Sequence, residues 1–155
     1  MNVVVLLDTG PLGLVTHPNA DDAQEIKQWI TDLLEAGIGV CVPEIADYEL
    51  RREYLRRDNQ RSIRRLEELE AELEFAPIST PVMHHAAACW ARARRIGKPT
   101  ADDKALDGDM ILVAHAAEIS KSAVKVVVAT SNVGHLATFV DARIWTEITP
   151  EAVLS

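Results

Sequence analysis

A run of five apolar residues without alternation, Val-Val-Val-Leu-Leu at positions 3–7, leads directly into Asp8. Such a run predicts a strand that is buried on both faces, as in a parallel sheet. Open α/β sheets place their functional residues outside the carboxyl ends of the strands, so Asp8 is a candidate for chemistry. A carboxylate at this position can equally serve as a turn or helix-cap residue. The run alone leaves both roles open.

Periodicity along the chain predicts one α/β domain that spans residues 1–155. Helical apolar spacing between residues 26 and 34 separates the first strand from a second short apolar run at 38–42, which together form a βαβ unit with parallel strands. Residues 11–20 are expected to be a loop. Further along, the pattern predicts a helical hairpin over 44–74 with its break near Asp58-Asn59, followed by a connector or short edge strand at 75–79. A helix from 80 to 96, a polar loop at 98–106 and a helix from about Asp107 to Ile119 are predicted next. A strand at 124–129 and an edge strand at 143–145 complete the prediction. The predicted fold class is a three-layer α/β/α domain with a mostly parallel sheet of four or five strands.

Composition limits the functions that this chain can have. Its 155 residues suit a single domain, and 48% hydrophobic with 26% charged residues is ordinary for a soluble globular protein. The net charge of −8 argues against a protein that coats nucleic acid. It does not exclude a nuclease, because seven of the 16 basic residues are arginines between Arg51 and Arg65.

The absence of apolar runs of membrane-spanning length, and of signal-peptide features, predicts a cytoplasmic protein. Cys41 and Cys89 each lie among apolar neighbours, so we expect two reduced, buried thiols rather than a disulfide. The histidines show no metal-ligand spacing and are expected at the surface or at the edge of the core. The three tryptophans are expected in the core or at a dimer contact.

Polar residues recur where the predicted strands end. Asp8 ends the first strand, Glu49 lies about two turns into the helix after the second, Asp109 lies in the first turn of the helix before the third, and Asn132 follows that third strand. Loops after successive parallel strands share one edge, so these side chains are expected to converge. Clustered carboxylates repel one another, and a hard divalent cation such as Mg²⁺ removes that penalty. Such a site activates water for attack on a phosphodiester.

Other acidic residues compete with two members of this set. Glu44 and Asp47 are nearer the second strand than Glu49 is, but Glu44 in the first helical turn suits a simple stabiliser of the helix dipole. Glu49 follows Ile45 by one turn on a face that begins apolar, which favours an inward carboxylate. Asp107 competes with Asp109 and is expected to be the helix N-cap or a supporting group.

Four sequence blocks together resemble the PIN-domain ribonucleases, and most closely the VapC-type toxins of bacterial toxin–antitoxin pairs. The blocks are Leu-Asp-Thr-Gly at 7–10, Val-Pro-Glu-Ile-Ala-Asp-Tyr-Glu-Leu at 42–50, Asp-Met-Ile-Leu-Val-Ala-His-Ala at 109–116 and Thr-Ser-Asn-Val at 130–133. Their order and spacing extend over nearly the whole chain.

The resemblance implies an Mg²⁺- or Mn²⁺-dependent endoribonuclease. Its metal ligands would be Asp8, Glu49 and Asp109, and Asn132 would complete the catalytic set. The resemblance further implies a homodimer and a partner antitoxin that silences the enzyme. The chain departs from the family pattern at Gly10, where Asn is common, and at Asn132, which occupies the fourth acidic position. A catalytically weak or inactive PIN-fold binding module is therefore the alternative.

Basic residues on the helix of Glu49 suit an RNA substrate. Arg51, Arg52 and Arg56 can hold phosphates near the metal, or can be paired with the glutamates at 67–74. An antitoxin with an acidic or arginine-bearing tail would compete for the same groove. Rival phosphatase and receiver sites are disfavoured, because the first needs an acidic residue at position 10 and the second needs an acidic pair at the first strand end.

Overall fold

The computed structural model describes residues 2–17, 21–96, 103–122, 124–134 and 136–155. Its elements in chain order are β1 (Asn2–Leu7), α1 (Thr9–Thr16), α2 (Asp21–Glu35), β2 (Gly39–Pro43), α3 (Glu44–Arg56), α4 (Gln60–Glu72), β3 (Glu74–Ala76), α5 (Thr80–Arg95), α6 (Asp103–Ser120), β4 (Val124–Thr130), the 3₁₀ turn Leu136–Thr138, β5 (Ala142–Ile144), the 3₁₀ turn Trp145–Glu147 and α7 (Pro150–Leu154). Within the described ranges, no helix is both long and apolar enough to cross a membrane.

The five strands form one sheet in the order β3-β2-β1-β4-β5, and every neighbouring pair is parallel. This confirms the predicted fold class. β1 lies in the middle, where Leu6 pairs with Cys41 of β2 and with Val128 of β4. The carboxyl ends of the three long strands therefore meet at one edge, which positions the residues that follow them side by side.

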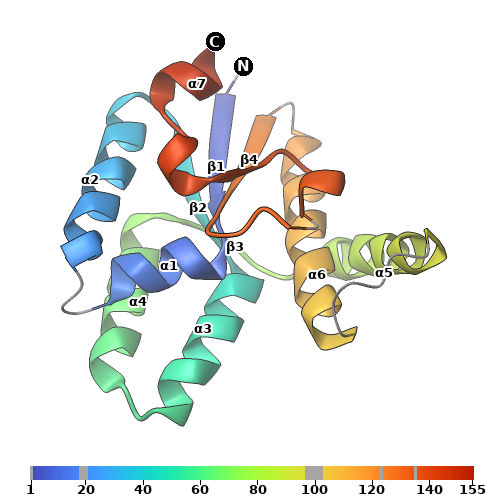
Figure 1. Cartoon of the computed structure of the whole chain (residues 1–155), viewed down its shortest axis with the longest axis horizontal. Coiled ribbons are helices and arrows are strands. Elements are labelled where there is room, and N and C mark those ends of the chain that lie inside the picture. The colour runs from blue at the N-terminus through green and yellow to red at the C-terminus, as the bar shows by residue number, and fades with distance from the viewer. Residues whose placement is uncertain (1, 18–20, 97–102, 123, 135) are drawn as a thin grey trace.

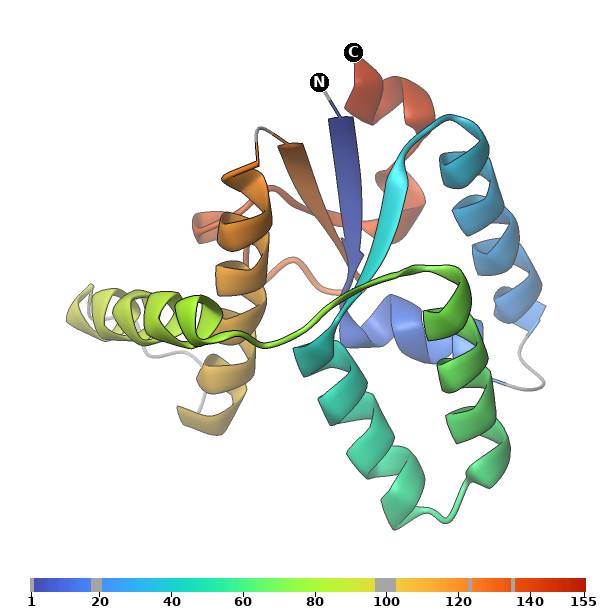
Figure 2. The same cartoon turned by 180° about the vertical axis from the view of Figure 1, so that it is seen from behind.

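Helices cover both faces of the sheet, which explains the unbroken apolar strands (Figures 1 and 2). α1, α2 and α4 pack on one face over Val5 and Leu7, and α6 packs on the other face over Leu6. α5 extends from α6, and the hairpin of α3 and α4 projects beyond the carboxyl end of the sheet. The two chain ends lie together at the opposite end.

The break that divides the hairpin lies where the sequence predicted it. Asp58 has φ of 53°, a left-handed conformation that ends α3, and Asn59 then caps α4 by accepting a 3.1 Å hydrogen bond from Ser62 N. The two thiols are free, as expected. Cys41 is buried, and burial raises its pKa to about 12, whereas Cys89 is only partly buried.

Two predicted loops were wrong in part. Residues 11–16 of the predicted loop belong to α1, because Leu12 and Val15 are buried against the sheet and outweigh the loop-forming glycines and proline nearby, and residues 18–20 of that loop lie outside the described residues. α6 begins at Asp103, four residues before the predicted start, so Asp107 is an exposed residue inside the helix and not its N-cap. The first four residues of α6, at 103–106, carry no apolar periodicity from which its boundary could be predicted.

Candidate acidic site at the carboxyl edge of the sheet

Asp8 is fixed by hydrogen bonds to both of its carboxylate oxygens. Its backbone ends β1 by bonding to Ala129 O at 2.9 Å, and its side chain caps α1. Oδ1 accepts from Thr9 N at 2.7 Å, and Oδ2 accepts from the hydroxyl of Thr130 at 2.9 Å. The sequence left two roles open for Asp8, a helix cap and a carboxylate at the strand end. In the structure Asp8 has both positions at once.

Glu49 reaches the same region from α3. Its Oε1 accepts a 3.2 Å hydrogen bond from the hydroxyl of Thr9, which directly follows Asp8. Its Oε2 lies against the backbone of Gly108, where an added Cβ would be only 2.8 Å away. Burial and, in smaller part, the charge of Asp8 raise the pKa of Glu49.

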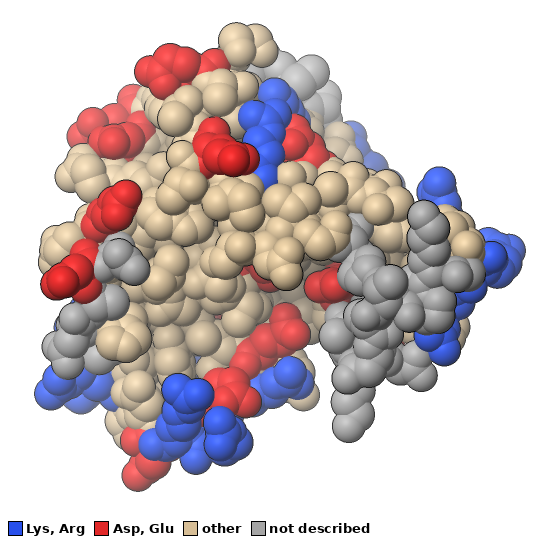
Figure 3. All heavy atoms as spheres, viewed as in Figure 1, with Lys and Arg blue, Asp and Glu red and all other residues tan. Residues whose placement is uncertain are grey.

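Asp109 and Asn132 line one open pocket with Asp8. The pocket has a volume of about 340 Å³ and lies at the carboxyl end of β1 and β4. Its lining also includes Gly10, Ser131, Val133, Gly134 and Leu136. Three of the four predicted site residues therefore share a pocket, and Glu49 adjoins it through its contacts with Thr9 and Gly108. Figure 3 shows acidic atoms inside the hollow on this face and basic side chains at its margin.

The competing acidic residues of α3 have other partners. Glu44 accepts a hydrogen bond from Ile78 N at 2.8 Å, which ties the start of α3 to the segment before α5. Asp47 is buried and receives two hydrogen bonds from Arg51, at 2.9 and 3.0 Å. Of these three carboxylates, Glu49 is the one that contacts the neighbour of Asp8.

The chemistry of this donor set fits a hydrated hard cation. Asp8, Glu49 and Asp109 offer carboxylate oxygens, which Mg²⁺ and Mn²⁺ prefer, and Mg²⁺ commonly keeps several waters beside one or two carboxylates. In the described part of the chain, no three His, Cys, Asp or Glu side chains are close enough together to enclose a metal ion. The carboxylates of Asp8 and Asp109 line an open pocket, and carboxylate oxygens beside open space suit an ion that keeps part of its water shell.

The arginines differ in their partners, and Arg51 makes the pairing with glutamates that the sequence offered as the alternative to a phosphate contact. Arg51 bonds to Asp47 and also pairs with Glu67 at 3.1 Å and Glu70 at 3.8 Å, which occupies its guanidinium. Arg56 pairs with Glu53 on its own helix at 2.8 Å. The exposed Arg52 instead has its guanidinium 5.2 Å from the ring centre of Tyr48, and its charge acts on Glu49.

Sequence reasoning missed the residues that contact the carboxylates of Asp8 and Glu49. Thr9, Gly108 and Thr130 flank three of the predicted residues, but only their contacts across the fold assign them a role. The threonine that directly follows Asp8 was the available signal. The expectation for the histidines is also wrong for His115, which is 1% exposed and whose pKa burial lowers to about 4.

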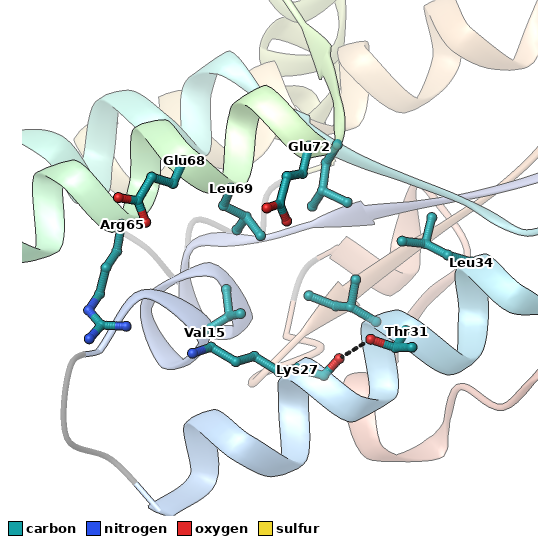
Figure 4. Close-up of a pocket in the computed structure, with 10 residues that line it drawn as sticks. Val15, Lys27, Thr31, Leu34, Arg65, Glu68, Leu69 and Glu72 are labelled. Atoms are coloured by element: carbon teal, nitrogen blue, oxygen red, sulfur yellow. Dashed lines mark hydrogen bonds between the residues drawn. The ribbon is translucent and has the colours of Figure 1, made fainter.

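A second hollow, of about 350 Å³, lies between α1, α2 and α4 (Figure 4). Leucine, isoleucine and valine side chains form much of its lining, and Lys27 and Arg65 lie near Glu68 and Glu72 at its rim. Its two acidic residues stand on one helix beside two cations. This hollow therefore lacks the convergent carboxylates of the acidic site.

Comparison with known proteins identifies a matching family model and solved structures with a similar fold. A family model described as PIN domain matches residues 5–131. Comparison with curated proteins gives no significant sequence match.

Three solved structures contain chains with a similar fold. VapBC2 of Rickettsia felis bound to a promoter DNA fragment matches with a TM-score of 0.69 and 14% sequence identity, over 92% of this chain and 99% of that chain. VapBC-1 of nontypeable Haemophilus influenzae matches with a TM-score of 0.67 and 17% identity, over 94% of this chain and 100% of that chain. DNA-bound VapBC of Salmonella typhimurium matches with a TM-score of 0.63 and 20% identity, over 92% of this chain and 98% of that chain.

Proposed function

Because the chain belongs to the PIN-domain family, a family of nucleases, we propose that it is a divalent-metal-dependent endoribonuclease. The observation that carries this proposal is the convergence of Asp8, Asp109 and Asn132 on one pocket, with Glu49 beside it. These residues come from three separate parts of the sequence and meet at the edge where parallel α/β sheets place their chemistry.

In this proposal Asp8, Glu49 and Asp109 hold Mg²⁺ or Mn²⁺. The bound ion would lower the pKa of water and stabilise charge on the phosphodiester that is cleaved. Asp8 is held in place as a ligand, because Thr9 N and the Thr130 hydroxyl each bond to one of its oxygens. The amide of Asn132 has a donor and an acceptor with which to orient water or a phosphate oxygen. Among Arg51, Arg52 and Arg56, we assign the phosphate contact to Arg52, which is exposed on α3 and whose charge acts on Glu49.

The biological role that we propose is the toxin of a toxin–antitoxin pair. The structures with similar folds are toxin–antitoxin complexes by their names, VapBC, and they support an antitoxin as the partner of this chain. We further propose that the chain acts on RNA in the cytoplasm, as a homodimer and as a single domain over residues 1–155. An inactive binding module remains the second candidate, because Asn132 supplies an amide where the family has a fourth carboxylate.

Cleavage of a mixed RNA pool by purified, antitoxin-free protein tests the proposal. We expect cleavage with Mg²⁺ or Mn²⁺ that is lost with EDTA and in Asp8→Asn. Asp107→Asn is the matched control, because Asp107 is an exposed acidic residue of α6 outside the pocket, and this variant should cleave like the parent. Cleavage that persists in EDTA would contradict a metal-dependent site. A folded protein that cleaves nothing and gains no stability from divalent ions would favour the binding module.

A further inference from the structure

Gly108 is where α6 approaches the carboxylate of Glu49 most closely. A Cβ on Gly108 would lie 2.8 Å from Glu49 Oε2, 3.3 Å from its Cδ and 3.5 Å from Oε1. The first of these distances is shorter than carbon and oxygen atoms tolerate without a shift. The carboxylate of Glu49 therefore occupies space that exists only because residue 108 has no side chain.

The other oxygen of the same carboxylate, Oε1, accepts a 3.2 Å hydrogen bond from the hydroxyl of Thr9. Thr9 directly follows Asp8, and Gly108 directly precedes Asp109. Glu49 thus lies between the neighbours of the two carboxylates that line the pocket. Its position is set from both sides by residues that are themselves adjacent to the site.

We propose that Gly108 is a positioning residue, whose missing side chain lets the Glu49 carboxylate lie within reach of the ion that Asp8 and Asp109 hold. The inference rests on the proposed function, since it concerns the same metal site. The four sequence blocks that resemble the family say nothing about residue 108, because the third block begins at Asp109. The requirement for glycine at this position is therefore an inference from the structure.

The contact makes glycine a requirement of the site and not of the fold. The atoms that a Cβ would meet are the far end of a flexible side chain, so Glu49 can rotate away at little cost in stability. Glycine inside a helix is also less favourable than alanine. Replacement by alanine should therefore leave folding intact or improve it, while moving the carboxylate away from its partners.

Gly13 provides a matched control on the other side of α3. It also lies within a helix, and its added Cβ would meet Leu50, the neighbour of Glu49, at an ordinary 3.6 Å. Gly13→Ala adds the same methyl group against the same helix without touching the carboxylate. We therefore compare Gly108→Ala, Gly13→Ala, Glu49→Asp and the double variant Gly108→Ala with Glu49→Asp.

Calorimetric titration with Mn²⁺, without RNA, measures the effect directly, and thermal unfolding of the same samples reports folding. We expect Gly108→Ala to weaken Mn²⁺ binding by about tenfold or more. Its melting temperature should equal or exceed that of the parent, and Gly13→Ala should bind Mn²⁺ like the parent. Glu49→Asp shortens the side chain and relieves the collision, so the added loss caused by Gly108→Ala should be smaller in that background.

Three results would overturn the inference, and they separate it from the proposed function. Parent-like Mn²⁺ binding by Gly108→Ala, with weakened binding by Asp8→Asn, would reject the role of Gly108 and leave the metal site standing. A lowered melting temperature that Glu49→Asp does not restore would assign Gly108 to folding instead. Equal Mn²⁺ binding by the parent and by Asp8→Asn would reject the site, and the inference with it.

Discussion

The hydroxyl of Thr130 lies 2.9 Å from Asp8 Oδ2 and joins the carboxyl end of β4 to that of β1, across 122 positions of sequence. The hydroxyl oxygen also accepts a hydrogen bond from Asn132 N at 3.1 Å. Its single proton has a second acceptor in reach, Asn132 O at 3.0 Å, but the charged carboxylate is the stronger of the two. Thr130 therefore couples the strand-end carboxylate to the loop that carries Asn132.

Removal of this hydroxyl by Thr130→Val should lower both stability and activity. Thr130 is 2% exposed, and its bond has a charged acceptor, so the expected loss in the free energy of unfolding is about 1.5–3 kcal/mol. RNA cleavage should fall by about 10–100-fold, as for other groups that orient a metal ligand. Urea unfolding and cleavage rates measure the two effects. Thr130→Ser keeps the hydroxyl and should retain most of both; if it fails as Thr130→Val does, the bond is not the cause.

Arg51 and Arg52 should separate structural from substrate contacts. Arg51→Ala leaves the buried Asp47 carboxylate without its partner, and we expect a loss of about 2 kcal/mol in the free energy of unfolding. Arg52→Ala should leave the free energy of unfolding unchanged and raise KM for RNA. The slope of the logarithm of the RNA-binding constant against the logarithm of the salt concentration should become about one unit shallower. Unchanged KM and slope in Arg52→Ala would remove Arg52 from the substrate surface.

Glu70 should make stability depend on pH. Burial, and then the neighbouring Asp47, raise the pKa of Glu70 from its ordinary 4.5 to about 8. Between these two pH values Glu70 keeps its proton in the folded protein, whereas the unfolded chain has released it. The contribution of Glu70 to the free energy of unfolding is therefore fully present below pH 4.5 and is lost as the pH rises through 8. Glu70→Gln does not titrate. The parent should therefore lose stability relative to this variant between about pH 5 and pH 8 in urea unfolding, and a constant difference would contradict the assignment.

Gly10 and Ser131 should form an interdependent pair. A Cβ on Gly10 would collide with Ser131 Oγ and lie 2.9 Å from Ser131 Cβ, which cannot rotate away. Gly10→Ala should therefore cost about 1–3 kcal/mol in the free energy of unfolding. Adding Ser131→Gly removes both colliding atoms and should recover most of that loss. Denaturant unfolding of the two single variants and the double variant tests the coupling, and additive losses would show that it is absent.

The sequence alone determined those features that depend on neighbours along the chain. Unbroken apolar runs predicted strands covered on both faces, and the sheet is indeed parallel with helices on each side. Asp8 and Asn132 follow strands and Asp109 lies in the helix before β4, and these positions were sufficient to predict that the three meet, because parallel strands bring their carboxyl ends to one edge.

Only the tertiary structure decided which charged residues are available for chemistry. Asp47 and Glu49 are two residues apart on one helix, yet the first is bound by Arg51 and the second faces Thr9, 40 positions away. The space beside Gly108 is likewise defined by a residue of another helix. Such contacts arise when segments distant in sequence pack together, and local periodicity carries no information about the partner that each side chain will find.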